Sequence, residues 1–134
     1  MKQVISFFYL FLIAFSVDAQ ITLSGTNYSQ NFDGVGSGLP AGFRLSSSAT
    51  ATTLGTAATF NSAIDANSPW NSTFSGWKNV ASADGLISSS NAATQAASTD
   101  RVVGIRQSSS LGDPGAALEM QLANTTGFSD FSMS

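Results

Sequence analysis

The sequence predicts an all-β fold, and three observations support that prediction. After residue 20, hydrophobic residues do not recur at the spacing of an amphipathic helix. Instead, polar and apolar residues alternate over several short segments, as they do in half-buried strands. Turn-forming residues separate these segments at intervals of about 8–12 residues, which is typical of a sandwich or a barrel. We therefore expect an antiparallel β-sandwich with a jelly-roll-like topology.

The first predicted strand covers residues 28–33, where two aromatic side chains share one face. A run rich in glycine then interrupts the alternation. A turn is predicted over residues 39–42, because Pro40 would fix the backbone angle of its second position. The next strand begins with Phe43 and includes Leu45.

Three consecutive strands are predicted near the end of the sequence, over residues 101–106, 118–123 and 128–134. Glycine-containing turns at residues 112–115 and 124–127 separate them. In the middle strand, Leu118, Met120 and Leu122 alternate with polar or small residues. We therefore expect this apolar face to lie in the core and the other face to contact water.

Two tracts consist mainly of Ser, Thr, Ala and Gly, over residues 46–59 and 82–99. Such a composition is typical of flexible linkers, but it also suits exposed strands and loops of a sandwich. Larger hydrophobic residues interrupt or follow the tracts at strand-like intervals: Leu54, Phe60, Leu86 and Ile87. This spacing favours strands and loops.

The last predicted strand continues to the final residue without a closing turn. An unpaired final strand would expose backbone donors and acceptors along a sheet edge, which natural proteins usually cover. We therefore expect the sandwich to be incomplete at its C-terminus. On this interpretation, residues 20–134 are the N-terminal part of one β-sandwich domain.

Residues 1–19 have the features of a cleavable signal peptide. Lys2 precedes an apolar run, and Val17, Asp18 and Ala19 provide small residues near a cleavage point. The run is shorter than the roughly 20 residues of a membrane-spanning helix, which argues against the alternative of an uncleaved anchor. No cysteine is available for lipid attachment. The sequence thus predicts a secreted or cell-surface protein that uses an export machinery.

Charge and composition narrow the classes of partner. The chain has a net charge of −3, and 10% of its residues are charged. Four basic residues follow the predicted signal peptide: Arg44, Lys78, Arg101 and Arg106. So few cations form no patch for phosphates, and we expect no nucleic acid partner. The segment after residue 19 also has no apolar run long enough to be a transmembrane segment.

Several short motifs carry a resemblance to a known class of proteins. Residues 30–34 read Gln-Asn-Phe-Asp-Gly, and residues 39–43 read Leu-Pro-Ala-Gly-Phe. Together with residues 100–107, 112–117 and 124–128, they resemble the N-terminal β-sandwich (jelly-roll-like) module of bacterial surface proteins exported by the type IX secretion route. The resemblance implies an extracellular jelly-roll module within a longer chain. Such chains end in a sorting domain and sometimes carry enzymatic or adhesive domains. It implies no catalytic residue here.

The residue types present argue against catalysis within residues 1–134. The chain contains neither histidine nor cysteine, which excludes the common nucleophile systems and the usual zinc and copper ligand sets. Glu119 is the only glutamate, and we expect it to point outward from a strand. A glycosidase needs two carboxyl groups across a cleft. An aspartate pair remains arithmetically possible, but most aspartates adjoin turn-forming residues.

Calcium is the one cofactor that the sequence suggests, because Ca²⁺ takes carboxylate and carbonyl oxygens from loops. Asp33 beside Gly34 and Asp100 beside Arg101 are the candidate ligands. The alternative is that these aspartates only form turns, as aspartate commonly does.

Trp70 and Trp77 form the best candidate for ligand binding. They flank residues 71–76, and two indole rings in such a segment could stack on a sugar. The alternative is that one or both fill the core.

We therefore expect a non-catalytic extracellular β-sandwich module with a structural or adhesive role. Its partner would be a surface polysaccharide, bound through Trp70 and Trp77, or a protein ligand. The alternative function is that of an ancillary N-terminal domain in a secreted hydrolase or nuclease whose catalytic domain lies beyond residue 134.

Overall fold

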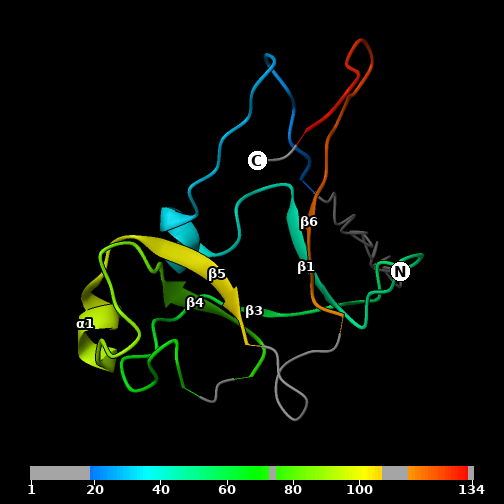
Figure 1. Ribbon diagram of the computed structural model, residues 1–134. Coiled ribbons are helices and arrows are strands. Elements are labelled where there is room, and N and C mark those ends of the chain that lie inside the picture. The colour runs from blue at the N-terminus through cyan, green and yellow to red at the C-terminus, as the bar shows by residue number, and fades with distance from the viewer. Residues whose placement is uncertain (1–18, 73–74, 107–114, 133–134) are drawn as a thin grey trace, which may run out of the picture.

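A computed structural model describes residues 19–72, 75–106 and 115–132, so residues 1–18 of the predicted signal peptide lie outside it. The described chain forms six short strands and two short helices (Figure 1). The elements, in order, are a 3₁₀ helix η1 (Asp33–Ser37), β1 (Phe43–Ser47), β2 (Thr56–Ala57), β3 (Phe60–Asn61), β4 (Trp77–Ala81), α1 (Ala92–Ala97), β5 (Arg101–Ile105) and β6 (Ala117–Met120). None of the helices in these residues is long and apolar enough to cross a membrane.

The strands form two small sheets, in the orders β2-β1-β6 and β3-β4-β5. The prediction of a β-rich fold is therefore confirmed. The prediction of antiparallel pairing holds for three strand pairs, but β3 and β4 are parallel, with Phe60 opposite Trp77. A parallel pair needs a long crossover between its strands, and residues 62–76 provide one here.

Three predicted strands are confirmed, because β1 and β5 lie within the alternating segments and β6 overlaps the one predicted over residues 118–123. The predicted strand over residues 28–33 is wrong. Local side chains bind its backbone instead: Phe32 N donates to Gln30 Oε1 (2.9 Å) and Asp33 N donates to Asn31 Oδ1 (3.3 Å). Such local bonds compete with strand pairing, and Phe32 has a left-handed φ of 62°. The segment therefore ends in η1.

The tract over residues 82–99 contains a helix where strands and loops were expected. Asn91 caps α1, because its Oδ1 accepts a hydrogen bond from Thr94 N (2.9 Å). Four of the six residues of α1 are alanine, the residue with the highest helix propensity. The helix is too short for a helical period to be visible in the sequence. The other tract, residues 46–59, contributes strand β2 and loops, as expected.

The predicted turn at residues 39–42 is present one position later. Phe43 N donates to Pro40 O (3.1 Å), so Pro40 is the first residue of the turn rather than the second. Gly42 has a positive φ of 84° and leaves space for a neighbouring segment. A Cβ atom at this position would lie 2.5 Å from Cγ1 of Ile21, which is only 7% exposed. The turn therefore creates a close contact with the N-terminal segment.

We expect the substitution Gly42→Ala to destabilise the protein by roughly 1–3 kcal/mol, because it combines a strained φ with a steric clash at Ile21. Urea unfolding would measure the change. Gly76→Ala is the matched control, since Gly76 has a φ of 74° but no atom of the described residues lies within 4 Å of the added Cβ atom. Equal losses in the two variants would contradict the proposed contact between Gly42 and Ile21.

The predicted C-terminal strand is absent from its described part, residues 128–132, while Met133 and Ser134 lie outside the described residues. Phe128 N donates to Thr125 O (3.0 Å), so the turn expected at residues 124–127 is present with a shift of one residue. Asp130 then has a left-handed φ of 58°, which interrupts an extended backbone. The turn predicted at residues 112–115 falls mostly outside the described residues.

Two segments extend away from the sheets on the same side of the molecule (Figure 1). We call residues 20–32 the N-terminal arm and residues 121–132 the C-terminal arm. They are joined at their bases by a parallel bridge between Ile21 and Leu122. Ile21 N donates to Gln121 O and Ala123 N donates to Ile21 O, each over 2.8 Å. This bridge fixes the start of the N-terminal arm beside the end of β6.

Candidate functional site

The apolar face of β6 is open, not covered as the sequence pattern suggested. Leu118 and Met120 are 44% and 42% exposed, whereas Ala117 and Glu119, which alternate with them, are partly buried. The prediction that the face with Leu118 and Met120 lies in the core is therefore wrong. Alternation shows which side chains share a face, but it does not show whether another layer covers that face.

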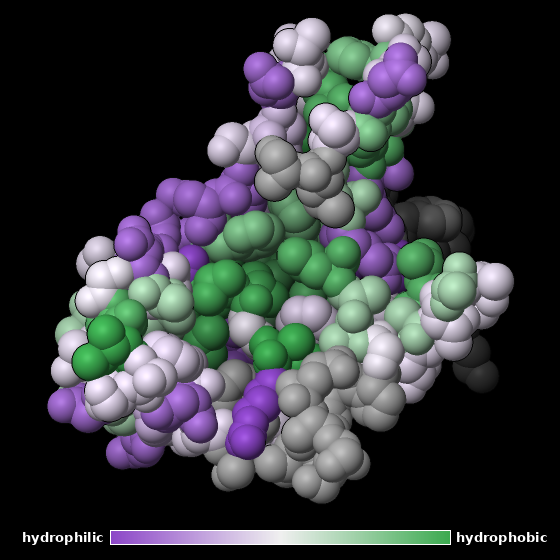
Figure 2. All heavy atoms as spheres, viewed as in Figure 1, coloured by the Kyte–Doolittle hydropathy of each residue, from purple (hydrophilic) through white to green (hydrophobic). Residues whose placement is uncertain are grey.

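A groove with a volume of about 550 Å³ lies over this face and between the two arms. Large apolar side chains line much of it: Leu23, Tyr28, Phe32, Phe43, Leu118, Met120, Leu122, Phe128 and Phe131. Figure 2 shows hydrophobic side chains gathered between the arms and on the face below them. Nine large hydrophobic side chains are exposed in the described chain, and five of them line this groove. Such a concentration is typical of surfaces that contact a partner or a ligand.

Phe43 organises the aromatic part of the groove. Its ring centroid lies 5.1 Å from that of Phe32 in an edge-to-face arrangement, with an interplanar angle of 74°. The ring of Tyr28 lies 6.3 Å away on a tilt of 35°. Both distances are within the range of favourable aromatic pairs. Strand β1 thus supplies a fixed ring against which the N-terminal arm packs, and this contact shapes one wall.

The charge of the groove limits what it can bind. Asp130 is the one charged side chain among the described residues that line it, and no lysine or arginine does so. Asp130 Oδ2 accepts a hydrogen bond from Ser129 Oγ (3.0 Å). Gln30 is already engaged through its Oε1 with Phe32 N. The lining therefore suits a neutral or mildly cationic ligand with apolar groups and opposes an anionic one.

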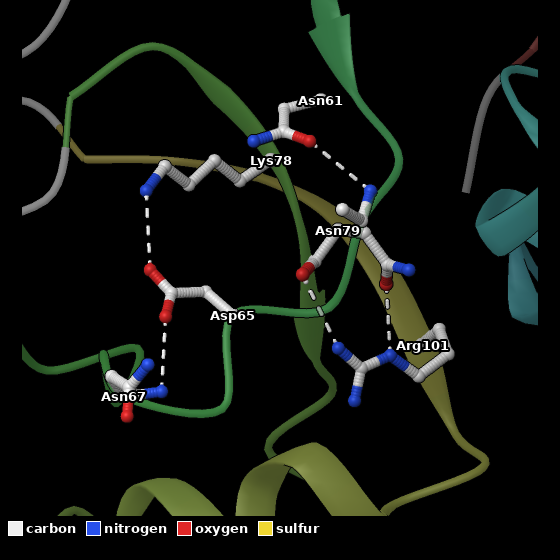
Figure 3. Close-up of polar contacts among 7 residues, drawn as sticks. Asn61, Asp65, Asn67, Lys78, Asn79 and Arg101 are labelled. Atoms are coloured by element: carbon white, nitrogen blue, oxygen red, sulfur yellow. Dashed lines mark hydrogen bonds and ion pairs between the residues drawn. The ribbon is translucent and has the colours of Figure 1, made fainter.

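Apart from the apolar groove, a buried arginine forms a polar centre on the other sheet (Figure 3). Arg101 in β5 is 5% exposed, and its Nε donates to Asn79 Oδ1 over 2.8 Å. Nη1 donates to Gln95 O (2.8 Å) and Nη2 donates to Asn79 O (3.2 Å). Burial lowers the pKa of Arg101 from its ordinary value. These bonds join β5 to β4 and α1.

The cavity beside this arginine is too small for an organic ligand. Its volume is about 10 Å³, close to the space for one water molecule. Trp70 and Gln95 contribute to its lining, and Trp70 N donates to Gln95 Oε1 over 2.5 Å. We interpret the Arg101 centre as structural.

Asp65 and Lys78 lie near this centre, with Lys78 Nζ 3.6 Å from Asp65 Oδ2 (Figure 3). The pKa of Asp65 is lowered mainly by the backbone hydrogen bond that Asn67 N donates to its Oδ1 (2.9 Å). A hydrogen bond from Ser68 and the charge of Lys78 lower the pKa further, and partial burial opposes them.

This lowered pKa predicts an acid-sensitive contribution to stability. In the window below about pH 4, the unfolded state binds a proton at Asp65 more readily than the folded state does, so stability falls as pH falls. We expect wild-type protein to lose more stability between pH 7 and pH 3 than Asp65→Asn does, by urea unfolding at both values. The same loss in the two proteins would contradict a role for Asp65.

The two predicted calcium ligands, Asp33 and Asp100, lie far apart in the sequence but near each other in the structure. Asp33 Oδ1 accepts a hydrogen bond from Arg101 N (3.0 Å), next to Asp100. Asp33 Oδ2 accepts one from Asn31 Nδ2 (2.6 Å). The main-chain carbonyl of Asp100 accepts hydrogen bonds from Ser82 N and Ser98 Oγ. No cluster of three acidic, histidine or cysteine residues suitable for a metal exists in the described chain. Calcium binding stays a prediction.

The two predicted sugar-binding tryptophans differ in exposure. Trp77 in β4 is 6% exposed, which favours the alternative that it fills the core, while Trp70 is partly buried. Nε1 of each indole is buried, and no hydrogen-bond partner exists for either among the described residues. Carbohydrate binding through Trp70 and Trp77 stays a prediction.

Sequence reasoning did not single out the groove residues as a site. It grouped Leu118 with Met120 on a face that it assigned to the core, and it placed Tyr28 and Phe32 on one face of a predicted strand. Comparisons of the chain with protein-family models, with curated proteins and with solved structures find no match. The candidate site therefore depends on its own geometry.

Proposed function

We propose that residues 20–134 act as a non-catalytic extracellular module of a cell-surface or secreted protein, and that the module is adhesive. The observation that supports this proposal best is the open apolar groove between the arms. The signal-peptide features of residues 1–19 support the location. The resemblance to jelly-roll modules of the type IX secretion route supports a sandwich as the framework of the whole domain.

The groove supports binding rather than catalysis. Acid–base hydrolysis of a glycoside needs two carboxyl groups on opposite sides of a bond, and the described lining supplies Asp130 alone. The sequence also contains no histidine or cysteine to act as a base or nucleophile. What the lining offers is contact area and shape.

Exposed apolar side chains give the groove its binding energy. Burying one such side chain completely contributes about 1.5–3 kcal/mol. Phe131 is 58% exposed and Tyr28 is 41% exposed, so both can lose considerable contact with water when a partner binds. Aromatic residues of this kind commonly dominate protein contact surfaces. A surface polysaccharide and a protein are the two ligand classes consistent with the aromatic lining.

An attachment assay tests this function. Beads coated with the full chain would be applied to cellulose, chitin and protein-coated surfaces, and the number retained under flow would be counted. We expect Phe131→Ser to reduce retention about tenfold, in line with the loss of one apolar anchor.

The control variant is Ile87→Ser, because Ile87 is 68% exposed but does not line the groove. It removes a similar exposed apolar surface from elsewhere, so we expect retention to stay at the wild-type level. If Phe131→Ser beads are retained as well as wild-type beads on every surface, the proposed adhesive role of the groove is wrong.

A further inference from the structure

Strand β6 has one open edge beside the groove. It pairs with β1 on one side and is the last strand of its sheet among the described residues. Gln121 N donates to Gly42 O (2.8 Å), which directs the backbone groups of residue 121 toward the β1 side. Because these groups alternate along a strand, those of Leu118 and Met120 point to the opposite side. No described residue forms a hydrogen bond with them there.

Among the described residues, this edge lacks two of the usual protections against pairing, lysine and proline. Natural edge strands carry lysine, proline, a bulge or a covering segment. None of the residues of β6, Ala117–Met120, is a lysine or a proline. Its one charged residue, Glu119, is partly buried, and its Oε1 accepts a hydrogen bond from Ser46 Oγ of β1. The charge is therefore directed toward the sheet and not to the open edge.

The continuation of β6 already forms a β-bridge with a single residue of another segment of this chain. Ile21 pairs in parallel with Leu122 through two backbone hydrogen bonds of 2.8 Å, on the β1 side. Ile21 is buried there, with 7% of the residue exposed. An extended segment with one apolar side chain is thus held next to the groove by main-chain pairing. The open edge offers the same main-chain chemistry over Leu118 and Met120.

We propose that the groove and the open edge of β6 together bind an extended segment of a partner protein as an added β-strand. The proposal rests on the adhesive function proposed above and names its ligand class. Backbone pairing with Leu118 and Met120 would supply affinity, and alternate apolar side chains of the partner would enter the groove. Because Asp130 is the charged group among the described lining residues, the bound segment carries no acidic side chains on that face.

A polysaccharide could fill the groove but would leave the open edge unpaired. A sugar chain cannot reproduce the regular ladder of N–H and C=O groups that a strand edge presents. The coincidence of alternating apolar side chains with an edge that no described strand occupies therefore favours a polypeptide over a sugar.

The test uses a fluorescein-labelled peptide of sequence Lys-Val-Thr-Val-Thr-Val-Thr-Val-Lys and the full chain, with binding followed by fluorescence polarisation. Two further peptides are N-methylated on alternate amides, one on the valines and one on the threonines. Each keeps the side chains but blocks one edge of the peptide strand. A peptide strand that is added to β6 forms hydrogen bonds through only one of the two peptide edges. We therefore expect one methylated peptide to bind like the parent and the other to bind roughly tenfold or more weakly.

A pair of protein variants tests the same pairing by changing the edge of β6 instead of the peptide. Met120→Pro removes an N–H group that points away from β1, so the pairing with β1 is retained, and Met120→Leu keeps that group. We expect weaker peptide binding for the first variant and little change for the second.

Equal binding of all three peptides would overturn the proposal, because it would show apolar contact without strand pairing. Absence of peptide binding would also overturn it. If the beads then attach to cellulose or chitin and lose attachment with Phe131→Ser, the strand proposal fails while the adhesive function stands. If Phe131→Ser has no effect on attachment, the adhesive function fails independently of the peptide result.

Discussion

Replacing Trp77 by alanine is expected to destabilise the protein by about 3–5 kcal/mol, a large part of the stability of a small domain. Trp77 is 6% exposed and begins β4, the central strand of its sheet. It lies opposite Phe60 of β3 and Ile105 of β5, so its loss would leave a cavity where all three strands meet. Urea unfolding, followed by far-ultraviolet circular dichroism, would measure the loss.

Trp77→Phe is the informative control for this substitution. Phenylalanine retains an aromatic ring and removes the indole Nε1, which is buried without a partner among the described residues. An unsatisfied buried donor costs about 1–3 kcal/mol, which offsets part of the lost volume. We therefore expect Trp77→Phe to change stability by about 1 kcal/mol or less. Similar losses in the two variants would contradict the packing role that we assign to the ring.

Replacing Arg101 by alanine is expected to cost about 2–4 kcal/mol, since several buried acceptors lose their donor together. Asn79 Oδ1 and the carbonyls of Asn79 and Gln95 all accept hydrogen bonds from this guanidinium group. Gln95 O also accepts a hydrogen bond from Ser98 N (3.2 Å), so the desolvation cost falls mainly on the two Asn79 acceptors. The links from β5 to β4 and α1 would weaken as a result.

Two further variants distinguish the loss of the Arg101 hydrogen bonds from the loss of its positive charge. Arg101→Lys keeps the positive charge but not the planar array of donors, so we expect it to recover little of the loss. Arg106→Ala removes a partly buried arginine that donates to Ser72 O (2.8 Å), and it should cost about 1 kcal/mol. Urea midpoints for all three variants would measure these effects. A full rescue by lysine would contradict the network.

Much of the strand content could be predicted from sequence, because alternation between β-prone and polar residues defines β1, β5 and β6. The parallel pairing of β3 with β4 could not be predicted, because each strand's choice of partner depends on the path of residues 62–76. Helix α1 escaped prediction because it is short and is positioned by tertiary bonds such as that from Trp70 N to Gln95 Oε1 (2.5 Å).

The groove shows a different limit of sequence reasoning. The spacing of Leu118 and Met120 correctly places both side chains on one face of a strand. It contains no information about what lies above that face, which depends on the arms. The left-handed backbone of Phe32 and the tight contact between Gly42 and Ile21 set the position of the N-terminal arm. Both features arise from local hydrogen bonds and steric fit, which alternation does not report.

The central claim is that the groove between the arms holds the ligand. The most direct test is the ¹³C-methyl resonance of Met120, assigned by Met120→Leu, during addition of the alternating valine–threonine peptide. Met120 is 42% exposed and lines the groove, so its methyl group reports on an occupant directly. We predict a saturable shift of this resonance that Phe131→Ser abolishes and Ile87→Ser preserves. A Met120 resonance that does not move while the peptide is bound would contradict the claim.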